Sequence, residues 1–205
     1  MDRSAPPRDR SASPARVCAY DVVRRVFEHG AYADRALHAH ARDLDPRERA
    51  LAAALVYGTV QRRATLDALA ATLVTRPLRR LEPAVLAGLR LGLFQILFLD
   101  GVADHAAVNE TVALVKPLSP GGASLTNAVL RRGVREGPTW LASLRDDTPE
   151  AAAVAHSIPA WLATRWWDEL GAESARALMA AVNRPAESAL RVNTLVAEVD
   201  EVLAA

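Results

Sequence analysis

The chain has 205 residues, of which 51% are hydrophobic and 5% aromatic, and its 25 basic and 24 acidic residues give a formal net charge of +1. This length buries a substantial core without disulfide or metal support, and the composition excludes collagen-like, wholly disordered and disulfide-scaffold proteins. The single cysteine, Cys18, excludes an intrachain disulfide and a cysteine-based zinc site. Because Ala and Leu, both strong helix formers, are abundant, the composition predicts an all-α or mostly α protein.

Positive charge gathers in the first part of the chain. Residues 1–80 contain 15 Arg and 9 acidic residues, a net charge of +6, whereas residues 136–205 contain 5 Arg and 11 acidic residues, a net charge of −6. Such an asymmetry favours a polyanionic partner for the N-terminal half. A GC-rich gene would also produce the strong preference for Arg over Lys.

Two segments determine the expected location. Residues 1–14 are rich in Arg, Ser and Pro and lack an apolar run, so they predict a disordered basic arm rather than a secretory signal. The most apolar run, residues 84–99, contains Arg90 and Gln95 and is shorter than the ~20 residues of a membrane span. We therefore expect a cytoplasmic protein with no membrane contact, in which this run is a buried central helix.

Apolar periodicity, prolines and capping residues predict helices from residue 15 onward. Asp45 and Pro46 form a typical helix start, and we expect the long helix that follows to bend or break at Gly58. The predicted helices cover residues 15–27, 32–42, 47–71, 84–99, 105–116 and 123–135. About seven helices with short connections predict a helical bundle over residues 15–138.

After Gly137 and Pro138, which are expected to close the last of these helices, residues 139–205 form a separate, acidic region. The first two predicted elements are a tryptophan-rich helix over residues 159–170 and a second helix beyond Gly171, over residues 172–182. They are followed by a strand over residues 188–195 and the start of another helix over residues 199–205. Because a lone strand is unstable, the strand predicts the opening of an incomplete α/β domain that continues beyond Ala205.

The sequence contains no motif that carries chemistry by itself. It has no Gly-rich phosphate loop or dinucleotide fingerprint, and His38 and His40 have the wrong spacing to share a metal on one helix face. His105 and His156 are candidates for acid–base catalysis, but a structural position explains each equally well, a helix start for His105 and a connection for His156. Cys18 fits a core position. We therefore expect this chain to bind no metal and to catalyse no reaction alone.

Three groups of arginines are candidate contacts to nucleic-acid phosphates, and each also has a structural explanation. The first follows the basic arm into a helix, where i,i+4 pairing with a carboxylate is the alternative. The second and third lie near helix ends, where cations interact favourably with the helix dipole. The groups are Arg3, Arg8, Arg10 and Arg16, running into Arg24 and Arg25; Arg62 and Arg63 with Arg76, Arg79 and Arg80; and Arg131, Arg132 and Arg135.

Five ordered blocks resemble the NusB-like RNA-binding domain. They are ARxxAYxVV at 15–23, VYGTVQR at 56–62, LRLGLFQIL at 89–97, DHAAVNETV at 104–112 and LTNAVLR at 125–131. The second and fourth blocks resemble the version of this domain that is fused to an rRNA methyltransferase more closely than free-standing NusB.

Three later blocks resemble the lead-in to the catalytic domain of the Sun/Fmu-type rRNA (cytosine-5)-methyltransferases. They are HSIPAWL at 156–162, NRP at 183–185 and LRVNT at 190–194. The resemblance implies S-adenosylmethionine as cofactor of the intact protein and two catalytic cysteines, one of which adds to the cytosine ring. The cofactor loop and both cysteines would lie beyond Ala205, so the resemblance implies a chain that binds no cofactor and is inactive alone.

The resemblance also implies a function for the helical bundle, which is to position small-subunit rRNA through phosphate contacts. The residues expected to make these contacts are Arg16, Arg24, Arg25, Arg62, Arg131 and Arg132, with Asn127 as a polar contact. The alternative is a non-catalytic, NusB-type transcription antitermination factor that binds RNA and a protein partner. For either function we expect a monomer.

Overall fold

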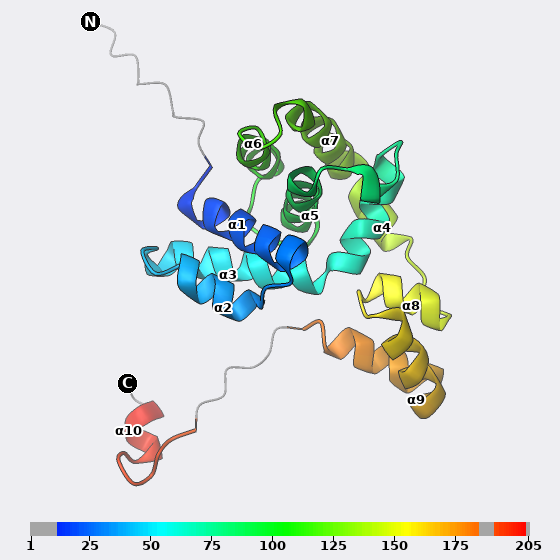
Figure 1. Cartoon of the computed structure of the whole chain (residues 1–205). Coiled ribbons are helices and arrows are strands. Elements are labelled where there is room, and N and C mark those ends of the chain that lie inside the picture. Colours follow the sequence, from blue (N-terminus) through cyan, green and yellow to red (C-terminus); the bar gives the residue numbers. More distant parts are fainter. Residues whose placement is uncertain (1–11, 185–190, 204–205) are drawn as a thin grey trace, which may run out of the picture.

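The computed structural model describes residues 12–184 and 191–203 (Figure 1). Within these ranges the chain forms α-helices and one short 3-10 helix, η1, and no strand. The helices are α1 (Pro14–His29), α2 (Ala33–His40), α3 (Pro46–Gln61), α4 (Arg63–Leu73), η1 (Leu78–Arg80), α5 (Pro83–Phe98), α6 (Asp104–Val115), α7 (Pro120–Ala142), α8 (Pro149–Ala155), α9 (Ala160–Ala181) and α10 (Val199–Leu203). The all-α prediction is confirmed for this part of the chain.

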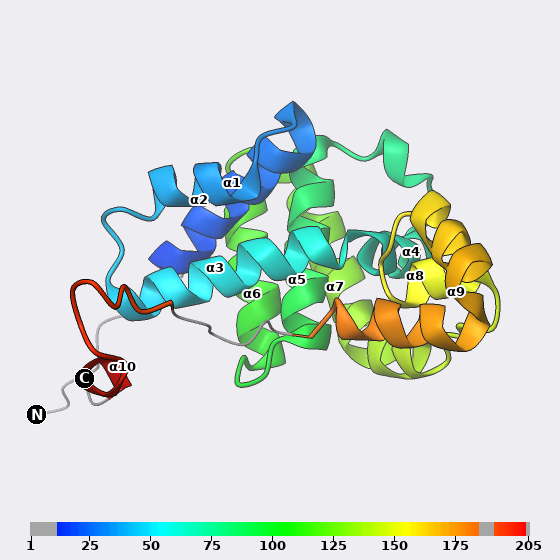
Figure 2. The same cartoon turned by 90° about the horizontal axis from the view of Figure 1, so that it is seen from below.

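Helix α5 is the centre of a bundle formed by α1 to α7. It packs against α1, α3, α4, α6 and α7, and most of its residues are buried, as expected of the most apolar run. Figures 1 and 2 show α5, α6 and α7 side by side, with α1, α2 and α3 crossing them. Gly88 and Gly92 make these close contacts possible, because a Cβ atom there would lie 2.4 Å from Val115 and 2.6 Å from Leu130.

The break predicted at Gly58 lies four residues later. Helix α3 continues through Gly58, and the chain turns at Arg62 before α4 begins. Gly58 is instead a packing position, because a Cβ atom there would lie 1.9 Å from the ring of Phe94. The Phe94 ring stacks on that of Phe98, with centroids 6.0 Å apart. Gly58 therefore leaves room for the Phe94 ring in the core. Helix propensity alone does not predict this role of the glycine.

Helix α7 also differs from its prediction, because it passes through Pro138 and ends at Ala142. A proline inside a helix removes one backbone hydrogen bond, and the turn that follows is retained because Trp140 packs against the main core. The predicted boundary between residues 138 and 139 therefore falls inside a helix.

Helices α8 and α9 form a smaller unit with its own apolar cluster, in which Ala152, Ala163 and Met179 are buried. Gly171 has a φ of 76° and kinks α9, which agrees with two predicted helices separated at this residue. The unit packs against α4 (Figure 2).

Three hydrogen bonds join the α8–α9 unit to the α3–α4 junction. Ser157 Oγ accepts from the backbone N–H of Ala64 at 2.8 Å, Thr65 Oγ1 donates to the carbonyl of Val154 at 2.6 Å, and Gln61 Nε2 donates to the carbonyl of Val182 at 2.9 Å. Because Ala64 lies in the first turn of α4, the hydroxyl of Ser157 caps this helix from another part of the chain.

The strand predicted over residues 188–195 is not found in residues 191–195, and residues 188–190 lie outside the described part. The carbonyl of Asn193 accepts from Val196 N at 2.9 Å, and its side chain accepts from Leu195 N at 3.1 Å. Asn favours such turns, and the described residues offer no second strand for pairing. The described residues therefore do not contain the predicted start of an α/β domain.

The predicted basic arm lies outside the described residues except for its last three positions, and two of these belong to the start of α1. The backbone N–H of Ser13 donates to Glu110 of α6 at 2.9 Å, and that of Ala15 donates to Glu48 of α3 at 2.6 Å. Carboxylates are stabilising at a helix N-terminus, so two other helices hold the start of α1 in place.

Candidate nucleic-acid interface

Arg16 is not placed to contact RNA, because its side chain is buried. Only 7% of the residue is exposed. Its Nε donates to Gln95 Oε1 at 2.6 Å, and its Nη1 lies 3.1 Å from Ser13 Oγ and 3.3 Å from Glu110 Oε2. These polar groups already occupy the guanidinium, so Arg16 ties α1 to α5 and α6 and is not a surface cation.

Arg24 and Arg25 are neighbours on α1 with different surroundings. Arg24 donates to both carboxylate oxygens of Glu28, at 2.7 and 2.9 Å, and this interaction raises the pKa of the guanidinium. Arg25 is exposed and makes no side-chain hydrogen bond or ion pair within the described residues. Of the three arginines expected on this helix, Arg25 is therefore the one whose charge is free to meet a phosphate.

Arg62 occupies the turn between α3 and α4. Its guanidinium carbon lies 4.8 Å from the centre of the Phe98 ring, an arrangement that is favourable for a cation over an aromatic face. Burial lowers its pKa. The stacking on Phe98 gives Arg62 a structural role at the junction between α3 and α4.

Asn127, Arg131 and Arg132 lie on α7. Arg132 donates to both oxygens of Glu136, at 3.0 and 2.8 Å, and to the carbonyl of Leu73 at 2.8 Å, so most of its donors are in use. Arg131 is exposed, and its Nε donates to Asn127 Oδ1 at 3.1 Å. Asn127 thus orients the guanidinium of Arg131 and leaves the two Nη groups for a ligand.

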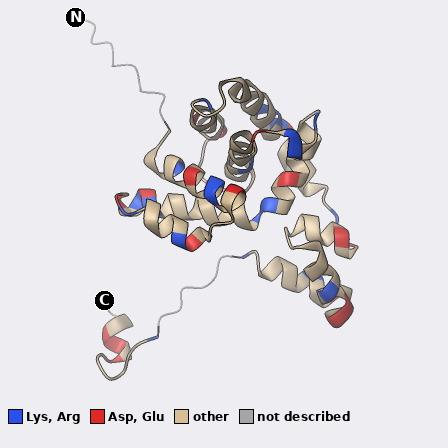
Figure 3. Ribbon diagram, in the orientation of Figure 1, with Lys and Arg blue, Asp and Glu red and all other residues tan. Residues whose placement is uncertain are grey.

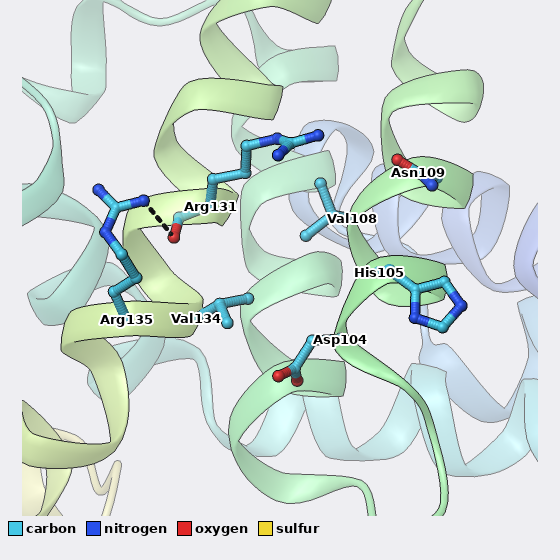
Figure 4. A pocket seen from close by; sticks show the side chains of 7 residues that line it. All are labelled: Asp104, His105, Val108, Asn109, Arg131, Val134 and Arg135. Atoms are coloured by element: carbon cyan, nitrogen blue, oxygen red, sulfur yellow. Dashed lines mark hydrogen bonds between the residues drawn. The ribbon is translucent and has the colours of Figure 1, made fainter.

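A shallow groove of about 330 Å³ runs between α6 and α7 beside Arg131 (Figure 4). Its lining residues are Asp104, His105, Val108 and Asn109 from α6, and Arg131, Val134 and Arg135 from α7. Arg131 extends from α7 toward Asn109, Asp104 lies at the opposite end, and the ring of His105 points away from α7. Arg135 turns back along its own helix, where Nη1 donates to the carbonyl of Arg131 at 3.1 Å.

The three arginine groups are distributed over different helices. Figure 3 shows basic and acidic segments alternating over the bundle, with no uniformly basic face in that view. Arg25 on α1 and Arg131 on α7 are exposed, and so are Arg76, Arg79 and Arg80 of the second group, around η1. Helices α1 and α7 both pack against α5 and α6. Sequence reasoning missed the groove residues Val108, Asn109 and Val134. Their only signal is helical spacing, because Val108 and Asn109 lie four residues after Asp104 and His105, and Val134 lies three residues after Arg131.

Neither a metal-binding cluster nor a membrane-spanning helix is found in the described residues. They contain no group of three or more His, Cys, Asp or Glu side chains arranged to hold a metal ion. No described helix combines the length and the apolar character that a membrane crossing requires. Burial raises the pKa of the Cys18 thiol, which is consistent with a core position.

Two family models match separate parts of the chain. The model described as the NusB family matches residues 13–135, which include α1 to α6 and most of α7. The model described as "Methyltr_RsmF/B-like, ferredoxin-like domain" matches residues 158–205, which begin just before α9. The second match overlaps the blocks that resemble the lead-in to the methyltransferase domain.

Comparisons with individual proteins agree with the two family matches. The chain is 31% identical over 188 residues to the probable ribosomal RNA small subunit methyltransferase B of Bacillus subtilis, covering 90% of this chain and 42% of that protein. The fold is similar to that of T. maritima NusB, with a TM-score of 0.56, 17% identity, and 62% of this chain and 93% of that chain covered. It is also similar to the crystal structure of PH0851, with a TM-score of 0.66, 21% identity, and 95% of this chain and 44% of that chain covered.

The chain thus spans about 40% of the length of the curated relatives that it matches. The fold agrees with NusB over the bundle, and the matched family model covers more than half of the chain. On these grounds the chain belongs to the NusB family.

Proposed function

We propose that this chain is the RNA-binding N-terminal region of an S-adenosylmethionine-dependent methyltransferase that modifies cytosine-5 in small-subunit rRNA. The observation that carries the proposal is the order of the two family matches, a NusB unit at residues 13–135 followed by an RsmF/B-like unit at residues 158–205. The relatives that share both parts have names that describe rRNA small subunit methyltransferases. A non-catalytic antitermination factor would account for the first match but not for the second.

In this function the bundle holds rRNA and the rest of the protein supplies the chemistry. Arg25 and Arg131 make the phosphate contacts, because their guanidinium groups are exposed and have donors to spare. Asn127 orients Arg131, Arg24 and Arg132 are paired with carboxylates on the same two helices, and Arg16 and Arg62 maintain contacts between helices. Such contacts fix the orientation of RNA without selecting its sequence.

The test is the salt dependence of binding of the 205-residue chain to labelled small-subunit rRNA fragments, measured by fluorescence anisotropy. Each phosphate contact to single-stranded RNA adds about −0.7 to the slope of log affinity against log salt concentration. Reversing Arg25 and Arg131 together to Glu is expected to make the slope less steep by about 1.4, because two contacts are lost. Arg165→Glu on α9 is the control, since it reverses an exposed arginine outside the bundle. A flat slope for the unmodified chain, or an unchanged slope for the double variant, would refute the proposal.

A further inference from the structure

The α8–α9 unit does not pack against the bundle over its whole facing surface. A cleft of about 660 Å³ lies between the two parts, with Val60 and Ala64 on the bundle side and Val154 and Ile158 on the other. The apolar cluster of the α8–α9 unit is also separate from the main core. Small and partly polar interfaces of this kind leave the angle between two parts free to change, unless specific contacts fix it.

Two contacts join the α8–α9 unit to a single turn of the bundle (Figure 2). Gln61, the last residue of α3, donates from Nε2 to the carbonyl of Val182 at 2.9 Å. Val182 follows the last residue of α9, so its carbonyl is one that the end of a helix leaves without an internal partner. The second contact is the bond from the N–H of Ala64 to Ser157 Oγ, and Ala64 lies only three residues beyond Gln61.

Asn183 links these two contacts inside the α8–α9 unit. Its Nδ2 donates to the carbonyl of His156 at 2.6 Å and to that of Met179, one turn back on α9, at 3.0 Å. Both hydrogens of the amide are thus in use. His156 directly precedes Ser157, and Asn183 directly follows Val182. The side chain of Asn183 therefore joins the two peptides that contact the bundle.

The three contacts form a closed ring. It runs from Gln61 to the end of α9, through Asn183 to the end of α8, and through Ser157 back to α4. A unit that is held at one point can rotate about it, but a unit held at two linked points cannot rotate without breaking a contact. The bond from Thr65 Oγ1 to the carbonyl of Val154 supports the same side of the ring.

We propose that Gln61 and Asn183 are positioning residues that hold the α8–α9 unit at one angle to the bundle, and that the ring opens as a whole. The loss of either amide therefore loosens the cap on Ala64, to which neither amide bonds. Under the proposed function, this angle is the one at which the bundle presents RNA to the part of the chain that follows α9. The ring itself requires no RNA.

The experiment measures amide hydrogen exchange in the 205-residue chain by NMR, without RNA, and follows the N–H of Ala64. Asn183→Asp keeps the size of the side chain and removes both donors. Since the loss of a hydrogen bond shifts an opening equilibrium by roughly 2–10-fold, exchange at Ala64 should become faster by about this factor. Asn193→Asp makes the same substitution at an exposed position outside the ring and should leave the rate at Ala64 unchanged.

Substitutions at Gln61 keep the test decisive if Asn183→Asp unfolds the α8–α9 unit. Gln61 is exposed, so Gln61→Met removes the donor without disturbing the core, and exchange at Ala64 should again become roughly 2–10-fold faster. Gln61→Lys places a donor on a side chain that is also straight, and it should return the rate toward that of the unmodified chain. A role in packing alone would be served equally well by Met and Lys.

The outcomes concern the ring and not the proposed function. Faster exchange at Ala64 in Asn183→Asp and Gln61→Met, with recovery in Gln61→Lys, would support the ring. An unchanged rate at Ala64 in the folded variants would overturn it, because the contacts would then open independently. Equal rates in Gln61→Met and Gln61→Lys would also overturn it, because the donor of Gln61 would then contribute nothing. The salt dependence of RNA binding tests the proposed function separately.

Discussion

Replacing Arg16 with Ala tests the distinction between buried and exposed arginines on α1. The substitution removes the donors that reach Gln95, Ser13 and Glu110 across three helices. Gln95 is 1% exposed, so its side-chain oxygen needs a donor from within the protein, and Arg16 supplies it. The folded state is therefore expected to lose stability, while the exposed phosphate contacts remain unchanged.

The size of the effect follows from burial. Leaving the oxygen of Gln95 without a donor costs about 1–3 kcal/mol, and the lost ion pair with Glu110 adds about 1 kcal/mol. The second figure is small because the side chain of Glu110 is 24% exposed and keeps the N–H of Ser13 as a partner. A total near 3 kcal/mol corresponds to a decrease of roughly 6–12 °C in the unfolding temperature of a chain of this size.

Arg25→Ala is the matched control, because Arg25 lies on the same helix but is exposed and unpaired within the described residues. Stability is measured by urea and thermal unfolding with far-UV circular dichroism, and RNA binding by its salt slope. Arg16→Ala should destabilise the protein and leave the slope unchanged. Arg25→Ala should leave stability within about 0.5 kcal/mol and reduce the slope by about 0.7. The reverse pattern would refute the assignment of Arg16 as a structural residue.

Three further predictions concern packing, capping and pH. Gly58→Ala should destabilise the protein by about 1–3 kcal/mol in urea unfolding, because its methyl group overlaps the Phe94 ring, and Phe94→Leu in the same chain should recover part of this loss. Ser157→Ala should cost about 1 kcal/mol, because the hydroxyl that caps Ala64 is lost; Ser157→Asn should cost less, because Asn tolerates the φ of 56° better than other residues that carry a Cβ atom. Burial raises the pKa of Tyr20 above its ordinary value of 10.0. Stability should thus be complete below about pH 10 and fall at higher pH, where the unfolded chain ionises first; in Tyr20→Phe the decline above about pH 10 should be smaller.

Helix positions were largely predictable from the sequence, because apolar spacing and prolines act locally. The start of α3 at Asp45 and Pro46 and the kink of α9 at Gly171 are examples. The errors arose where a distant residue decides the outcome. Gly58 faces a ring from α5 instead of ending its helix, and Pro138 stays within α7 because the following turn packs against the core.

The candidate interface was predictable only in part, for the same reason. Sequence spacing groups Arg16 with Arg25, but their difference depends on Gln95 and Glu110, which lie far along the chain. Arg131 was identified by its motif, whereas Asn109 became a candidate only when α6 and α7 were seen to form a groove. Charge patterns indicate which residues are cations, and tertiary packing determines which of them are available.

The cap that Ser157 provides to α4 affects where the protein can be divided. Deleting the chain after α7 would remove the partners of Ala64 and Thr65 and expose the surface of α4 that now meets α8. A truncated bundle would therefore fray at the first turn of α4 although every residue of that helix is present. The first turn of α4 thus depends on Ser157, which lies beyond residues 13–135, the part that the NusB family model matches.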